Sequence, residues 1–239
     1  MSARISISDA LRQAVREVEA LTGRKVVFFN LAEKAGGIGS MVQGYRRRDG
    51  NREFVWLDGH LPVVASEATA AHELGHIIQE AVRFPGAVVA DEQTASAQSK
   101  RLAAGINNLV RDLNADRWAL KHGFKVGEAL ADSALPRVVG AMQHDAGLAV
   151  VSQNNRLETD ADLMAVDYAA LRLRTQRYGL FDGLDRLWAD KWPESRRLGL
   201  KLWKSLSLRR FSSPAACRRA LETILKVLNV SPDIITITG

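Results

Sequence analysis

The segment 72–76, with the sequence HELGH, limits the fold of this chain more than any other feature. It lies within Ser66 to Arg83, where apolar residues recur at the three- and four-residue spacing of an amphipathic helix. Four residues of α-helix turn through about 400°, so His72 and His76 would lie one turn apart on the same face. Glu73 would be rotated by about 100° from His72. The sequence therefore predicts a helix that carries two imidazoles side by side.

Two helix histidines at this spacing can bind one tetrahedral Zn²⁺ together, and Glu73 is then close enough to act on a water without being a ligand itself. The alternative is that His72 and His76 make ordinary hydrogen bonds of a structural helix. A catalytic zinc needs a third protein ligand and one open position. With a single cysteine in the chain, that ligand has to be a histidine or a carboxylate.

Residues 111–124 (RDLNADRWALKHGF) offer such a ligand. Asp112 and Asp116 lie one helical turn apart in the predicted long helix 94–122, and Asn108 lies one turn earlier. Asp116 falls on the apolar side of that helix, where a carboxylate needs a partner or a metal. We assign Asp112 as the third ligand and Asp116 as the acceptor of an imidazole N–H. The reverse assignment stays open, and Asn108 is a weaker candidate for a supporting hydrogen bond.

Both carboxylates could instead form surface ion pairs with basic neighbours on the same helix. Those neighbours are Arg111, Arg117 and Lys121.

With these residues in place, the chain resembles the gluzincin-like HExxH metallopeptidases. Residues 112–119 are similar to the ExxADxxA segment of the HtpX and CAAX-prenyl-protease zincins, with aspartate at the position of glutamate. The chain also lacks the transmembrane helices of those proteins. A second resemblance, to the soluble ImmA/IrrE-type zincins, depends on the AHELGH segment 71–76 and on the same acidic, alanine-containing helix. The resemblance covers about residues 25–124.

Hydrophobic periodicity and turn residues predict an α+β fold that is mostly helical. Helices are expected over 5–21, 66–83 and 94–122, and strands over 25–31, 40–47 and 52–58, the last two joined at Asp49-Gly50-Asn51 as a hairpin. Further helices are expected after residue 127. We interpret residues 1–125 as a zincin-like core, in which a three-stranded sheet packs on the HExxH helix, and residues 126–239 as a helical region.

The resemblance implies that the chain is a zinc-dependent metallopeptidase that hydrolyses peptide bonds in a protein or peptide substrate. Glu73 would be the general base for the zinc-activated water. The strand 52–58 is our candidate for the edge that pairs with an extended substrate, and Gly75 would let that layer approach closely. The sequence does not single out an oxyanion donor among His122, His144, Tyr168 and Tyr178.

The net charge of +6 and the basic clusters 46–48, 172–177 and 196–210 keep nucleic-acid binding as a second hypothesis. A non-catalytic zinc-binding interaction protein is a third. No apolar stretch approaches the roughly 18 residues of a membrane-spanning helix, so we expect no membrane insertion and a cytoplasmic location. Cys217 is expected to be a buried apolar residue. The oligomeric state is not indicated by the sequence.

Overall fold

The computed structural model describes residues 7–30, 44–59, 61–133, 161–176 and 181–239. These residues form a mostly helical α+β structure, as the sequence predicts. Contacts group the chain into two compact units, one of residues 1–82 and 115–153 and the other of residues 83–114 and 154–239. None of the described helices combines the length and the hydropathy that a membrane span requires.

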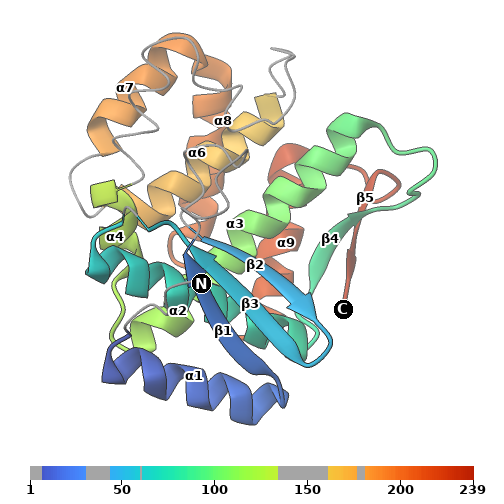
Figure 1. The fold of residues 1–239 in the computed structure, drawn as a ribbon. Helices are drawn as coiled ribbons and strands as arrows, with labels where there is room; N and C mark the ends of the chain where they lie inside the picture. Colours follow the sequence, from blue (N-terminus) through green and yellow to red (C-terminus); the bar gives the residue numbers. More distant parts are fainter. Residues whose placement is uncertain (1–6, 31–43, 60, 134–160, 177–180) are drawn as a thin grey trace. The chain divides into compact units, whose positions relative to one another are not determined.

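The first unit contains a three-stranded sheet and the helices that cover one of its faces (Figure 1). Its elements are α1 (Asp9–Thr22), β1 (Lys25–Asn30), β2 (Gly44–Asp49), β3 (Arg52–Leu57), α2 (Val63–Ala81) and α4 (Val126–Ser133). The helix α3 (Ala97–Lys121) belongs to both units, because the division falls between Asn114 and Ala115.

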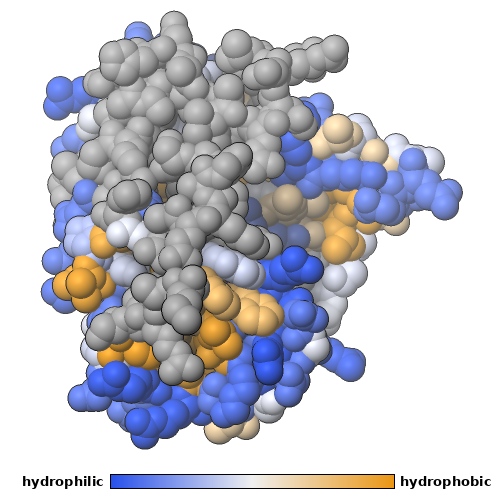
Figure 2. Space-filling view, in the orientation of Figure 1, coloured by the Kyte–Doolittle hydropathy of each residue, from blue (hydrophilic) through white to orange (hydrophobic). Residues whose placement is uncertain are grey.

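The first helix is expected over residues 5–21 and spans Asp9–Thr22, with a local signal at each end. The Ser8 hydroxyl accepts a hydrogen bond from the backbone N–H of Leu11, and Gly23 ends α1 in the left-handed conformation, with φ of 67°. The outward face of α1 is hydrophilic, as the lower edge of Figure 2 shows. The start of α2 was predicted less well: the helix begins at Val63 after Pro62, three residues before Ser66, where the predicted range 66–83 begins. Pro62 is the N-cap residue, and its carbonyl accepts a hydrogen bond from the N–H of Ser66.

The order of strands in the sheet is β1-β3-β2, with β1 parallel and β2 antiparallel to β3. The β2–β3 hairpin turns at Gly50, whose φ of 57° is the conformation that an Asp-Gly turn supplies. Our expectation that strand 52–58 forms the substrate-pairing edge is wrong, because β3 is hydrogen-bonded on both sides. Among the described strands, β2 lies at one edge of the sheet and β1 at the other.

The core of the first unit forms where the sheet and α1 pack on α2. Alternation along β3 turns Val55 and Leu57 toward the helices, where both are almost completely buried. On α2 the matching residues are Leu74 and Ile77, each fully buried. The HELGH segment therefore lies on a helix held against the sheet on one side.

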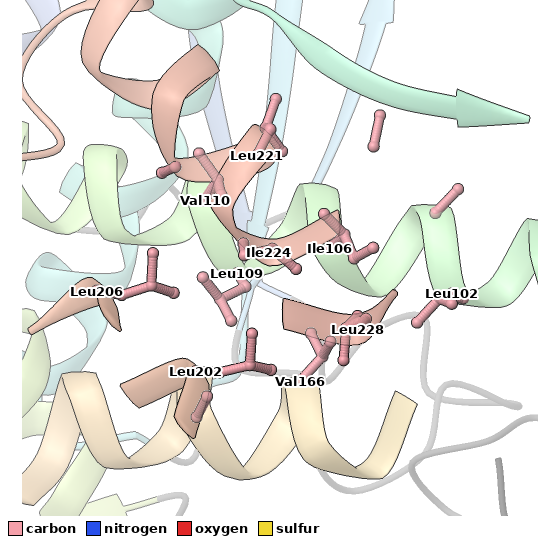
Figure 3. Close-up of a cluster of buried hydrophobic side chains, with 14 of the residues drawn as sticks. Leu102, Ile106, Leu109, Val110, Val166, Leu202, Leu206, Leu221, Ile224 and Leu228 are labelled. Carbon is pink, nitrogen blue, oxygen red and sulfur yellow. The ribbon is translucent and has the colours of Figure 1, made fainter. Parts of the chain in front are cut away.

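The second unit has its own helical core (Figure 3). Its elements are β4 (Gly86–Val89), the first part of α3, α6 (Ala161–Thr175), α7 (Phe181–Lys191), α8 (Pro193–Leu206), α9 (Pro214–Leu228) and β5 (Ile235–Thr238). The antiparallel pair β4–β5 was not predicted. The side chains that meet in the core are Leu102, Ile106, Leu109 and Val110 of α3, Val166 of α6, Leu202 and Leu206 of α8, and Leu221, Ile224 and Leu228 of α9.

The two units alternate along the sequence, and the 25 residues of α3 continue from one unit into the other without a break. Sequence composition does not change at residue 114, and no local signal marks the division. The division into a core of residues 1–125 and a helical region of residues 126–239 stays a prediction.

Candidate metal centre

The HELGH helix touches α3 at its glycine. A Cβ atom at Gly75 would lie 2.8 Å from the Cα of Ala115 and 2.9 Å from its Cβ, closer than carbon atoms can pack. Gly75 and Ala115 are both completely or almost completely buried. The expectation that Gly75 admits the strand layer is wrong, because the backbone that it admits is that of α3.

Each imidazole has an acceptor beside it, Asp116 of α3 for His72 and Gln79 of α2 for His76. The Nδ1 of His72 donates to Oδ1 of Asp116 over 2.7 Å, which is the contact expected for Asp116. The Nδ1 of His76 donates to Oε1 of Gln79 over 3.0 Å. Gln79 is 1% exposed, and sequence analysis did not single it out. The sequence feature that could have revealed Gln79 is its position: it is a polar residue three positions after His76, on a buried face of the helix.

With both Nδ1 atoms engaged as donors, the two Nε2 atoms present lone pairs, and they lie 3.0 Å apart. Two neutral imidazoles in this arrangement repel each other unless a proton or a cation lies between them. Two imidazole nitrogens bound to one tetrahedral zinc would be about 3.3 Å apart. The observed spacing of the His72 and His76 nitrogens is close to that distance.

Asp112 completes a group of three potential ligands. One atom from each of His72, His76 and Asp112 can be chosen so that all three lie within 4.8 Å of one another, and such a group could hold a metal ion. Asp112 precedes Asp116 by one turn of the same unbroken helix, so the two carboxylates follow each other along α3. Two imidazole nitrogens and one carboxylate oxygen are a donor set that suits Zn²⁺, and the residues present therefore fit that metal.

The other sequence candidates lie elsewhere. Asn108 is exposed, and its side chain makes no hydrogen bond to the three ligands among the bonds of the described residues. His122 contacts Glu17 through Nε2, and the Tyr168 hydroxyl donates to Asp185 in the second unit. His144 and Tyr178 lie outside the described residues.

Glu73 faces the start of β2. A Cβ atom built on Gly44 would lie 3.3 Å from Oε1 of Glu73 and 2.6 Å from Cγ2 of Thr69, so only glycine allows the strand to pass so close to α2. Further along β2, Arg46 forms an ion pair with Glu80 of α2 and a second, at 3.3 Å, with the fully buried Glu53 of β3. The edge strand is therefore fastened to the HELGH helix at Glu80, about two helical turns after Glu73.

The positive charge of Arg46 also interacts with the carboxylate of Glu73. Burial disfavours the charged guanidinium, but the hydrogen bond to Glu80 and the negative charges of Glu53 and Glu73 outweigh burial and raise the pKa of Arg46. Arg46 thus stays charged beside Glu73. After Gln79, Arg46 is the second candidate functional residue that sequence analysis did not single out, since it appeared there only as part of the basic cluster 46–48.

Comparison of the chain with protein-family models, with curated proteins and with solved structures found no match. The interpretation of this site therefore depends on its geometry and chemistry.

Proposed function

We propose that this chain is a zinc-dependent peptidase with a zincin-like core, in which His72, His76 and Asp112 hold the metal and Glu73 is the general base. One observation carries the proposal: the Nε2 atoms of His72 and His76 converge to 3.0 Å while both Nδ1 atoms donate elsewhere. Two Nε2 atoms this close need a proton or a cation between them, and a cation would also use the nearby Asp112.

The metal would supply Lewis-acid polarisation of a peptide carbonyl and a lowered pKa for water. The protein supplies the rest. Asp116 and Gln79 hold the two imidazoles in the tautomer that leaves Nε2 as the ligand atom. Glu73, one residue after His72, takes a proton on its carboxylate from the attacking water and returns that proton to the leaving amine.

The strand β2 is the part of the sheet that could hold a substrate. Its backbone begins beside Glu73 at Gly44, and its outer side has no strand partner among the described residues. An extended peptide that added to this edge would gain backbone hydrogen bonds with little demand on its sequence. Fastened by Arg46 to α2 and β3, β2 would present that peptide at a fixed distance from Glu73.

The decisive experiment substitutes Glu73→Gln and measures zinc content and peptide hydrolysis. The variant should retain about one zinc per chain by elemental analysis, because Glu73 is not a ligand. Cleavage of a fluorescently labelled unfolded protein should fall at least 100-fold, the usual contribution of a general base. Cleavage by the variant at the wild-type rate would refute the assigned role.

Glu67→Gln is a matched control on the same helix. Glu67 accepts a hydrogen bond from the backbone N–H of Ser8 and lies five residues before His72, about 140° around the helix axis from it. This variant should cleave like the wild type even where its stability is lower. A loss of activity equal to that of Glu73→Gln would show that any change of charge on α2 is harmful.

A second candidate function is nucleic-acid binding, which the surface of α8 favours. Residues 193–228 contain nine basic and two acidic residues, so they carry a net charge of +7, whereas the whole chain carries +6. Arg197, Lys201 and Lys204 are exposed at a spacing of four and three residues, on one face of α8. Arg209 and Arg210 are exposed just after the helix.

Such a ridge could contact phosphates without reading a base sequence. The test is a titration with a labelled DNA duplex at several salt concentrations. Nucleic-acid binding predicts an affinity that falls steeply with salt and is weakened by the pair Lys201→Glu and Lys204→Glu. No binding at low salt would exclude this function.

A further inference from the structure

The outer face of the three-stranded sheet, which is the face turned away from α2, carries a cluster of aromatic rings. Val55 and Leu57 of β3 point toward the helices. The alternating residues Phe54 and Trp56 therefore point to the outer face. Phe29 of β1 is paired with Trp56 in the register of the sheet and lies on the same face. In Figure 1 the strands lie in front of α2, so the outer face is turned toward the viewer.

The three rings contact one another. The ring centroids of Phe29 and Trp56 are 5.6 Å apart, and an angle of 22° between the ring planes makes this a stacked pair. The Phe54 ring is tilted against both, with its centroid 5.7 Å from that of Phe29 and 5.9 Å from that of Trp56. Trp56 is 9% exposed, whereas Phe29 and Phe54 are half-buried. The tryptophan thus supports two phenylalanine rings that keep part of their surface open to water.

Exposed cations border these rings on the same face. The register places Arg47 of β2 opposite Phe54. It also places Lys25 of β1 opposite Arg52 of β3. Side chains directly opposite each other have Cβ atoms about 4.5–5.5 Å apart. Arg47 and Arg52 form no ion pair with another described residue, while Lys25 pairs with a carboxylate of α1. Among the described strands, Asp49 is the one acidic residue on this face, so the face is positively charged.

Aromatic rings and cations are the two components of a surface that binds a single strand of nucleic acid. Every base has a π-face that can stack on a ring, and the phosphates that link the bases pair with arginine or lysine. The bases of a duplex are stacked inside the helix and do not reach such rings. We propose that the outer face of the sheet binds single-stranded nucleic acid, with bases stacked on Phe29 and Phe54 and a phosphate held by Arg47.

This site is independent of the candidate metal centre and of the basic surface of α8. It also gives a function to Arg47, a member of the basic cluster 46–48. Stacking of one base on an aromatic side chain changes a binding constant by about 5–150-fold. One phosphate contact contributes about 0.7 to the slope of log K against log salt concentration for a single strand.

The test measures the fluorescence anisotropy of a labelled oligodeoxythymidine of about ten nucleotides, which forms no duplex, at several salt concentrations. The wild type should bind it with an affinity that falls as salt rises. Phe54→Leu keeps an apolar side chain without a ring, so it should weaken binding at least about fivefold and leave the salt slope unchanged. Arg47→Gln should weaken binding and lower the slope by about 0.7. No binding by the wild type at about 20 mM salt, or wild-type binding by either variant, would overturn the proposal.

Arg48→Gln is the matched control. Arg48 is the next residue of β2 and is also exposed, but it faces the other side of the sheet, opposite Glu53. This variant should bind the oligonucleotide like the wild type. Equal losses for Arg47→Gln and Arg48→Gln would reveal a general attraction to positive charge and would overturn the proposal. If Phe54→Leu does not fold, this pair of surface variants decides the matter.

Two further measurements separate this site from the basic surface of α8. An unlabelled duplex of the same length should compete poorly for the labelled single strand, because its bases are not available for stacking. The pair Lys201→Glu and Lys204→Glu should leave binding of the oligonucleotide within about threefold of the wild type. Competition by the duplex as strong as by the single strand would overturn the proposal, as would loss of binding in the lysine pair.

Discussion

Gly75→Ala is the substitution that tests most directly how the fold builds the metal centre. The added Cβ would lie 2.8 Å from the Cα of Ala115. Carbon atoms pack at about 3.5 Å or more, so α2 and α3 would have to separate locally by roughly 0.7 Å. The hydrogen bond between His72 and Asp116, now 2.7 Å long, would stretch toward the limit of about 3.5 Å at which it is lost.

Two opposing contributions determine how much Gly75→Ala changes the free energy of unfolding. Overpacking a tight contact costs about 1–3 kcal/mol, whereas replacing glycine by alanine inside a helix gains about 0.5–1 kcal/mol. The free energy of unfolding of Gly75→Ala should therefore fall by about 0.5–2 kcal/mol, which corresponds to a decrease in Tm of roughly 1–8 °C. Zinc affinity should fall by about 10–100-fold, the usual effect of losing a partner of a ligand histidine.

Gly183→Ala is the matched control, since Gly183 lies in α7 and a Cβ there meets nothing within 4 Å. It should stabilise the chain slightly and leave zinc binding unchanged. Urea unfolding and chelator competition on the two variants provide both measurements. The reasoning would be refuted if Gly75→Ala were as stable as Gly183→Ala and bound zinc like the wild type.

Three further predictions address single residues. Asp112→Asn should raise the zinc dissociation constant at least about 100-fold, because a neutral amide is a poor zinc ligand, while Asn108→Ala should leave it unchanged; chelator competition measures both. Burial raises the pKa of the Cys217 thiol to about 12, so at pH 8 only about one molecule in 10⁴ carries the reactive thiolate. A thiol reagent should therefore label Cys217 only in urea, and rapid labelling of the folded protein would contradict its burial. The hydrogen bond from Arg196 lowers the pKa of Asp185, so the stability that this carboxylate contributes is present above its unfolded pKa and is lost as the pH falls through its folded pKa. Asp185→Asn should lower the free energy of unfolding by about 1–3 kcal/mol at pH 7, and this difference should shrink in acid; an equal difference at all pH values would be inconsistent with the ion pair.

The parts of the fold that the sequence predicted are those that short-range chemistry decides. Ser8 and Gly23 bound the first helix because a side-chain cap and a left-handed residue act within one turn. The turn at Gly50 fixes the β2–β3 hairpin in the same way. The spacing of His72 and His76 likewise needed only the geometry of a helix.

The parts that sequence analysis missed depend on residues far apart in the chain. The short strand β5 pairs with β4 across about 150 residues, and neither segment indicates its partner. β3 became the central strand because β1 pairs with it in parallel, which alternation along β3 does not reveal. Arg174 reaches Asp112 across 62 residues, and its position in a basic cluster gave no sign of that contact.

The edge position of β2 has a consequence for how copies of the chain behave together. An unpaired strand edge is a template on which a second molecule can add its own strand, and this is a common start of aggregation. Arg47 and Arg48 are exposed along β2, so two molecules that met edge to edge would bring four guanidinium groups together. We therefore expect this repulsion to keep the molecules apart at low ionic strength and concentrated salt to remove the protection.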